Sequence, residues 1–262
     1  MAHSKLSLPV NRVAQIGGSG YSPAAMSDTS KVLYEGKAKQ VLESADPQHY
    51  ILHFKNSATA FNNKKKAELE GKGVVNQKIS AKIFQYLQEN GIASHYVKTL
   101  NDTDMLVKKV TIIPLEVVLR NTAAGSLCKR LGIKEKQELN PTLLEFYYKK
   151  DELEDPLVTE DHIRILGLAT PSDLSEIKTV AHKINGLMIT FFEKIGVKLV
   201  DFKLEFGRDD RGHLLLADEI SPDGCRLWDM KTMEIMDKDR FRKDLGNVIE
   251  SYNEIYRRLE NS

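Results

Sequence analysis

The residues with the clearest potential for chemistry lie in two neighbouring segments. The segment "LVDFKLEFG" (199–207) alternates apolar side chains with Asp201, Lys203 and Glu205. Alternate side chains of a strand point to opposite faces, so these three charged residues share one face. The polar loop "GRDDRG" then leads into "HLLLADEI", which predicts a hairpin that brings Asp218 beside that face. An ordinary charged outer face is the alternative interpretation.

Three carboxylates gathered around one lysine would repel one another unless a cation and anionic ligands share the site. Mg²⁺ prefers oxygen ligands and usually keeps substrate phosphates in its coordination shell. The cluster of Asp201, Lys203, Glu205 and Asp218 therefore indicates a site for Mg²⁺ and phosphate.

A second cluster lies in "YEGKAKQV" (34–41). Gly36 allows a tight turn near a ligand, and Lys37 and Lys39 point the same way if the backbone is extended. The segment matches neither the P-loop nor the dinucleotide-binding motif. A phosphate-binding loop and a charged hairpin tip both fit this pattern.

A third cluster is "LRNTAAGSLCKR" (119–130), in which small residues leave backbone N–H groups accessible. Arg120 and Ser126 are suitable partners for a phosphate or carboxylate. The alternative is a helix start capped by Asn121 or Ser126, with the arginine in solvent.

Composition narrows the class of protein. The chain has 262 residues and a formal net charge of +1, which argues against a broad grip on nucleic acid or an anionic membrane. No apolar run approaches the roughly 20 residues that span a bilayer. Cys128 and Cys225 are far apart and lack a CxxC partner, so we expect two small, partly buried hydrophobic residues in a reduced, cytoplasmic protein.

Periodicity predicts the elements that position these clusters. Strands are expected at 31–44 and 50–55, and a helix at 76–91 that ends at Gly91. Segment 105–121 is expected to form two strands broken at Pro114, and the charged, proline-containing segment 139–158 to form loops with short strands. Amphipathic helices are predicted at 175–196 and 239–261.

A series of sequence blocks between residues 31 and 259 closely resembles the SAICAR synthetase family, of the compact bacterial type, in which the blocks occur in the same order. The blocks are "YEGKAK", "TAFN", "GKGVVNQKIS", "PLEVVLRNTAAGSLCKRLGI", "YYKKDELEDPLV", "LVDFKLEFG", "LADEISPDGCRLWD" and "DKDRFRKDLG". The resemblance implies an α+β, two-lobed ATP-binding fold related to ATP-grasp enzymes, with an antiparallel sheet in each lobe and flanking helices. The expected division is a small N-terminal lobe at 28–110 and a larger lobe with the C-terminal helix at 111–262.

The resemblance also implies a reaction. Members ligate L-aspartate to the carboxylate of carboxyaminoimidazole ribonucleotide (CAIR) and hydrolyse ATP to ADP and phosphate, in purine biosynthesis. ATP is expected to convert the carboxylate into an acyl phosphate. The implied partners are ATP, Mg²⁺, CAIR and L-aspartate, with no nucleic acid or membrane, and a homodimer is possible. A ligase or kinase with another acceptor, or a nucleotide sensor without activity, are the alternatives.

Roles are carried over to individual residues by the same resemblance. Those expected to contact ATP are Gly36, Lys37, Ala38, Lys39, Lys149, Glu205 and Asp218. Those expected to bind CAIR or aspartate are Arg120, Ser126, Asp201, Lys203, Arg226, Lys238 and Arg242. Catalytic roles are implied for Asp201, Lys203 and Arg226, and Mg²⁺ coordination for Glu205, Asp218 and Asp155. Asp223, in the turn of "SPDG", is expected to orient Arg226 or to touch the substrate.

Two segments depart from the family pattern. Residues 1–27 contain no acidic residue and have no counterpart, so we expect a disordered extension or a remnant of cloning; a transit peptide is conceivable. Asn63 stands where glycine is more usual, which concerns the shape of that loop.

Overall fold

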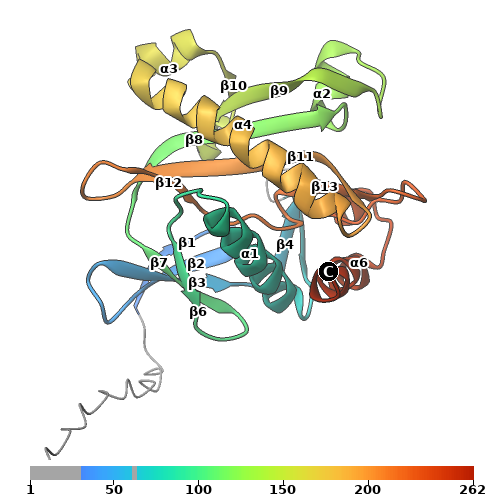
Figure 1. Cartoon of the computed structure of the whole chain (residues 1–262), viewed down its shortest axis with the longest axis horizontal. Coiled ribbons are helices and arrows are strands. Elements are labelled where there is room, and N and C mark those ends of the chain that lie inside the picture. The colour runs from blue at the N-terminus through green and yellow to red at the C-terminus, as the bar shows by residue number, and fades with distance from the viewer. Residues whose placement is uncertain (1–30, 61–63) are drawn as a thin grey trace, which may run out of the picture. The chain divides into compact units, whose positions relative to one another are not determined.

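The structure, a computed structural model, describes residues 31–60 and 64–262 (Figure 1). The predictions for residues 1–27 and for Asn63 lie outside these ranges. Among the described residues, no helix is both long enough and apolar enough to cross a membrane.

The first half of the described chain forms an antiparallel sheet of five strands, in the order β1-β2-β3-β7-β6. The strands are β1 (Val32–Glu35), β2 (Lys39–Glu43), β3 (His49–Phe54), β7 (Asp104–Lys108) and β6 (Tyr96–Thr99). A separate pair is formed by β4 (Ser57–Ala60) and β5 (Lys65–Glu68). The predicted strands at 31–44 and 50–55 are confirmed as β1, β2 and β3.

The second sheet has six strands, all antiparallel, in the order β10-β9-β8-β11-β12, with β13 also paired to β11. The strands are β8 (Thr111–Thr122), β9 (Glu138–Tyr148), β10 (Leu157–Val158), β11 (Val197–Arg208), β12 (Leu214–Ala217) and β13 (Cys225–Asp229). The predicted hairpin is confirmed, because β11 pairs with β12 from Arg208↔Leu214 to Glu205↔Ala217. The fold is thus a mixed α/β fold with antiparallel sheets.

Helices pack on both sheets (Figure 1). They are α1 (Lys72–Glu89), α2 (Ser126–Leu131), the 3₁₀ turn η1 (Asp151–Leu153), α3 (Glu160–Leu166), α4 (Pro171–Glu193), α5 (Asp239–Arg242) and α6 (Val248–Glu260). The apolar stripe predicted for α1 is confirmed, since Ile79, Ile83, Phe84 and Leu87 are fully buried. α1 lies over the first sheet with α6 beside it, and α4 lies along β11 and β8.

The predicted strand break at Pro114 was wrong. The chain leaves the ladder at residues 109–110, between β7 and β8, and Pro114 lies inside β8. A proline lacks the N–H that a ladder needs and is tolerated at a bulge. The pairing of β8 with β11 is irregular there, because it shifts between Glu205 and Gly207, opposite Pro114.

The prediction of loops with short strands at 139–158 was wrong for its first half, residues 139–148, which belong to the eleven-residue strand β9. Its charges and proline suggested a solvent-exposed connection. The register of β8 against β9 shifts between Arg120 and Thr122, where a bulge accommodates Pro141. Glu145 of β9 bonds an arginine of a polar pocket, described below.

The helix predicted at 239–261 is divided into α5 and α6. Asp244, Gly246 and Asn247 have positive φ values of 56°, 67° and 49°, and such residues cannot continue a right-handed helix. Leu245, counted in the predicted apolar stripe, is 48% exposed in the connection. The helix predicted at 175–196 is confirmed as α4, which begins at Pro171 after the capping residue Thr170.

Packing of α1 on β3 depends on Gly73. A Cβ atom there would lie 2.5 Å from the carbonyl oxygen of Phe54, which is backbone and cannot swing aside. We expect Gly73→Ala to lower the free energy of unfolding by about 1–3 kcal/mol, because α1 must shift.

Gly186→Ala is the matched control. Gly186 lies in the helix α4 with no atom within 4 Å of the added Cβ, so alanine should raise the free energy of unfolding by up to about 1 kcal/mol. Denaturant titration of both variants measures the two changes. Equal stabilisation by both would contradict the proposed close contact.

Candidate active site

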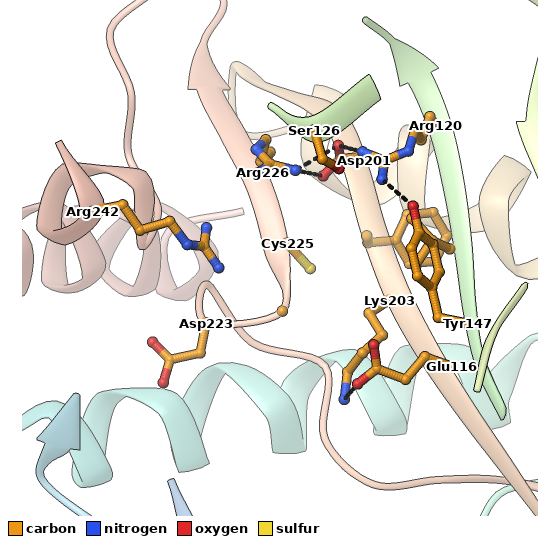
Figure 2. A pocket seen from close by; sticks show the side chains of 13 residues that line it. Glu116, Arg120, Ser126, Tyr147, Asp201, Lys203, Asp223, Cys225, Arg226 and Arg242 are labelled. Carbon is orange, nitrogen blue, oxygen red and sulfur yellow. Dashed lines mark hydrogen bonds and ion pairs between the residues drawn. The ribbon is translucent and has the colours of Figure 1, made fainter. Parts of the chain in front are cut away.

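Two adjoining pockets gather the charged clusters. The first, here called the lysine pocket, has a volume of about 650 Å³ and lies between the β1–β2 loop and the ends of β11 and β12. Its lining includes Gly36, Lys37, Ala38, Lys39, Lys149, Asp151, Asp155, Glu205, Asp218, Glu219 and Lys238. The second, the arginine pocket, has a volume of about 340 Å³ (Figure 2). Its lining includes Arg120, Ser126, Tyr147, Asp201, Arg226 and Arg242.

The two pockets share part of their walls. Glu116, Lys203, Asp223 and Gly224 line both. Lys203 is central in β11 and Glu116 reaches toward it from β8, with 3.2 Å between Lys203 Nζ and Glu116 Oε1. A ligand in one pocket therefore lies within reach of a ligand in the other at this lysine.

The loop between β1 and β2 delivers the first lysines. It is closed by the Gly36 N–H, which donates to the Lys39 carbonyl at 2.8 Å. Lys37 faces Asp151 across the opening, at 2.8 Å, with both side chains largely exposed. Lys39 instead points inward, where its Nζ contacts Asp218 and lies 3.0 Å from Glu219 Oε1.

The charged face of β11 is interior, so its interpretation as a solvent-facing surface was wrong. Glu205 is 2% exposed, and its Oε1 contacts Lys203 Nζ at 2.5 Å and Lys149 Nζ at 2.9 Å. Asp218 Oδ2 is 3.3 Å from Lys203 Nζ, as the predicted hairpin requires. Lysines and carboxylates thus alternate across the pocket floor.

These contacts keep the groups charged. Burial alone would raise the pKa of Asp218, but the charges of Lys39, Lys203 and Lys149 outweigh it and hold that pKa well below its usual value. Burial would likewise lower the pKa of Lys203, yet Glu205 and Asp218 raise it well above the usual value. Asp218 and Lys203, which face each other across the pocket floor, are therefore ionised at neutral pH.

The backbone of Asp218 is held in an unusual conformation. Its φ is +61°, a left-handed value that is uncommon for aspartate. Its carbonyl accepts a hydrogen bond of 2.9 Å from His95 Nε2. Burial lowers the pKa of His95 to about 4, so this ring is neutral and donates through Nε2–H.

The oxygen donors are suitable for Mg²⁺, although the described residues contain no group of three or more His, Cys, Asp or Glu side chains arranged to hold a metal ion. Glu205 and Asp218 are joined through Lys203 on one wall. Two carboxylates are a common protein contribution to a Mg²⁺ site whose other ligands are water and substrate phosphates. Asp155 lines the same pocket, and its Oδ1 accepts from the Lys150 N–H at 2.9 Å.

The arginine pocket is organised around Asp201 of β11 (Figure 2). In the sheet, Asp201 is paired with Arg120 of β8 on one side and with Arg226 of β13 on the other. Asp201 Oδ2 accepts from Arg120 Nη1 at 2.7 Å and from Arg226 Nη1 at 2.9 Å. Its side chain is only 5% exposed. This geometry makes Asp201 the group that aims the two arginines.

The charge alternation continues outward on both sides. Arg120 Nε donates to Glu145 at 2.8 Å, and Glu145 also contacts Arg130. Arg226 Nε donates to Asp239 at 3.0 Å, and Asp239 also accepts from Arg242 at 2.5 Å. The seven groups Arg130, Glu145, Arg120, Asp201, Arg226, Asp239 and Arg242 form a row with four positive and three negative charges. The excess of one positive charge favours an anion.

Gly125 completes this pocket by leaving space for Arg226. A Cβ on Gly125 would lie 2.5 Å from Arg226 Nη2, and φ at this residue is +59°. The next residue, Ser126, begins α2 and lines the pocket. Glycine therefore satisfies both a backbone and a packing requirement here.

Every residue to which the family resemblance assigned a site role lines one of the two pockets. The prediction that Asp223 orients Arg226 was wrong, because its carboxylate lies 2.7 Å from Lys72 Nζ instead; the alternative, that it touches the substrate, stays a prediction. Lys72, Glu116, Glu145, Tyr147 and Asp239 were missed. Glu145 and Tyr147 alternate along β9, and this signal was lost when the segment was interpreted as loop.

Cys128 is partly buried and Cys225 is buried, and both are free thiols, as predicted. Burial raises the pKa of the Cys225 thiol well above its usual value, and nearby carboxylates add to this. This thiol lines the arginine pocket as an uncharged group.

Comparison with known proteins agrees with this geometry. The family model of SAICAR synthetase matches residues 32–259. Phosphoribosylaminoimidazole-succinocarboxamide synthase of Caldanaerobacter subterraneus is 54% identical over 89% of this chain and 99% of its own. The crystal structure of the same synthase from Ehrlichia chaffeensis has a TM-score of 0.86 and 48% identity, over 88% of this chain and 98% of that one.

A SAICAR synthetase structure in complex with ADP has a TM-score of 0.85 and 45% identity, over 88% of this chain and 98% of that one. Sequence and fold agree over nearly all the described residues. The chain therefore belongs to the SAICAR synthetase family, the ATP-dependent ligases of purine biosynthesis.

Proposed function

We propose that the lysine pocket binds the phosphates of ATP and that the arginine pocket binds the ribonucleotide CAIR. The observation that carries this assignment is the shared wall, where Lys203 faces both pockets. The CAIR carboxylate and the terminal phosphate of ATP have to meet, and a cation at the junction stabilises both.

The reaction needs two displacements. An oxygen of the CAIR carboxylate attacks the γ-phosphorus of ATP, the bond to ADP breaks, and an acyl phosphate forms. The amine of L-aspartate then attacks the acyl carbon, a C–N bond forms, phosphate leaves and the amine loses a proton. No side-chain nucleophile is required, so catalysis consists of positioning and charge stabilisation.

Charge supports the assignment of each pocket. All three substrates are anions, and Gly36, Lys37, Ala38, Lys39 and Lys149 place backbone and ammonium groups around the lysine pocket. Phosphate oxygens bound there share Lys39 and Lys149 with Asp218 and Glu205. Charge-assisted contacts of this kind are stronger than neutral hydrogen bonds.

Glu205 and Asp218 are the residues that would hold Mg²⁺ beside the ATP phosphates, with Asp155 as a further candidate. The ion would neutralise charge that develops on the phosphates during transfer. Lys203 remains close to both carboxylates and orients them.

Asp201, Arg120 and Arg226 form the core of the proposed ribonucleotide site, and the two guanidiniums present N–H groups suited to a phosphate. Ser126 adds a hydroxyl on the same wall. Lys238 and Arg242 lie on the side nearest α5 and are the candidates for the incoming aspartate or the ribose phosphate.

Several broader predictions stay open to experiment. We propose a small lobe at 28–110 and a larger lobe at 111–262, in a fold related to ATP-grasp enzymes. The separate five- and six-stranded sheets support this division.

The two free cysteines support a cytoplasmic location. A homodimer is tested directly by light scattering. A ligase or kinase with another acceptor is not favoured, because the family match covers the acceptor pocket as well.

The proposed function predicts strict dependence on both acceptor substrates. With ATP and Mg²⁺ present, sustained ADP release should require CAIR and L-aspartate together: without CAIR no acyl phosphate forms, and without aspartate the acyl phosphate is not consumed, so turnover stops after the first displacement. A coupled ADP assay with each component omitted in turn measures this. Full ADP release without CAIR would contradict the assignment of the arginine pocket.

Arg226→Lys tests the arginine pocket while leaving a positive charge for Asp201 and Asp239. Lysine cannot reproduce the planar fork, so KM for CAIR should rise about tenfold or more, whereas ADP affinity should stay within about twofold. Steady-state kinetics measures KM for CAIR, and calorimetry measures the affinity for ADP.

Arg258→Lys is the matched control, since Arg258 also bridges two carboxylates, Asp229 and Glu254, at 2.8 Å each but lines neither pocket. It should leave KM for CAIR unchanged. A similar loss of CAIR affinity in both variants would refute the specific role of Arg226.

The metal assignment predicts how Mg²⁺ changes nucleotide binding. Mg²⁺ should strengthen ADP binding by about tenfold or more in the unaltered chain, and Asp218→Asn should reduce this gain to less than about threefold. Asp151→Asn, at the exposed rim of the same pocket, should keep the gain. Calorimetry with and without Mg²⁺ decides, and an undiminished gain in Asp218→Asn would rule out coordination by this carboxylate.

A further inference from the structure

A buried carboxylate at the junction of the pockets is held by residues outside the proposed substrate contacts. Asp223 follows Pro222 in the turn between β12 and β13 and lines both pockets. Its Oδ2 lies 2.7 Å from Lys72 Nζ, and its Oδ1 accepts a hydrogen bond of 2.8 Å from Tyr252 Oη. The Lys72 side chain is 1% exposed and the Asp223 side chain 5%.

The partners of Asp223 come from different parts of the fold. Lys72 is the first residue of α1 and Tyr252 lies in α6, and these two helices pack against each other (Figure 1). Lys238, before α5, lies 3.9 Å from Asp223 Oδ2. One carboxylate thus joins α1, α6 and the segment that leads into α5.

The carboxylate is ionised. Burial would raise the pKa of Asp223, but the charges of Lys238 and Lys72 and the hydrogen bond from Tyr252 outweigh burial and hold the pKa far below its ordinary value. A buried ion pair generally stabilises a fold no better than an apolar pair of similar size, while its geometry is far more specific. A buried ion pair in the wall of an active site therefore indicates that the site requires these side chains at defined positions.

The turn that Asp223 fixes is connected directly to the reacting region. The Ser221 carbonyl accepts from the N–H groups of Gly224 and Cys225 at 2.9 and 3.0 Å, so the turn is compact. The Gly224 carbonyl accepts from the Lys203 N–H at 3.0 Å. Two residues further on, Arg226 pairs with Asp201 across β11. A displacement of Asp223 would therefore shift both Lys203 and Arg226.

We propose that Lys72 and Tyr252 are positioning residues of the ligation reaction. By clamping Asp223 they fix the turn at residues 221–224, and the turn sets Lys203 and Arg226 at the spacing that brings the acceptor carboxylate to the nucleotide. The inference rests on the proposed function, because Lys203 and Arg226 are assigned there to the two substrates.

Tyr252→Phe removes one buried hydroxyl and leaves the ion pair of Asp223 with Lys72. We expect kcat to fall about tenfold, because the turn loses one of its two anchors, with KM for ATP within about twofold of the original. The melting temperature should fall, because the buried Asp223 carboxylate loses one hydrogen-bond donor, so kcat is compared well below the melting temperature of the variant.

Tyr256→Phe is the control, one turn further along α6 and outside both pockets. It should retain the original kcat. Equal kcat for Tyr252→Phe, Tyr256→Phe and the unaltered chain would overturn the positioning role of Tyr252.

Lys72 is tested by a pair of variants. Lys72→Met leaves Asp223 in the interior without its ion-pair partner and should lower both the melting temperature and kcat. Adding Asp223→Asn removes that unpaired charge, so the double variant should regain most of the melting temperature but not kcat. Recovery of both together would show that the pair serves stability alone and would refute the proposal.

The same assay separates the two levels of inference. If neither the unaltered chain nor Tyr256→Phe releases ADP in a way that depends on CAIR and aspartate, the proposed function is refuted. If the unaltered chain, Tyr256→Phe and Tyr252→Phe all release ADP at the same rate, only the positioning role is refuted.

Discussion

The constraint on which this structure depends is the burial of charge on one face of β11. Asp201 and Glu205 are almost inaccessible, and each needs a cation within contact distance, because an isolated buried carboxylate is very costly. Arg120 and Arg226 neutralise the first, and Lys149 and Lys203 the second. Lys203 lies between the two carboxylates along the strand and lines both pockets.

Neutralisation by the protein itself also explains how a chain of net charge +1 handles substrates that are all anionic. The cations are not spread over the surface as in nucleic-acid-binding proteins. The cations of the candidate site line two pockets, where carboxylates hold them. When a phosphate binds, it shares lysines or arginines already oriented for it, so little reorganisation is needed.

The sequence was most informative where pattern and chemistry coincide. The alternation in "LVDFKLEFG" and the following hairpin correctly predicted a charged strand face with Asp218 beside it, because strand period and a short polar loop fix both. The sequence was least informative about β9, where charges and a proline concealed an interior strand. The partner of Asp223 could not be predicted either, because Lys72 is distant in sequence and reaches Asp223 only through the packing of α1.

The pairing of Lys39 with Asp218 joins residues 179 positions apart, and Lys65 of β5 contacts the Phe241 carbonyl over 176 positions. Closing loops of this length costs conformational entropy before any contact can compensate, and contacts of high sequence separation slow folding. The two parts of the described chain must both be in place before the lysine pocket has its full set of charges. In a partly folded chain the lysines and carboxylates of the site stay hydrated and apart, so the ability to hold nucleotide is acquired together with the last long-range contacts.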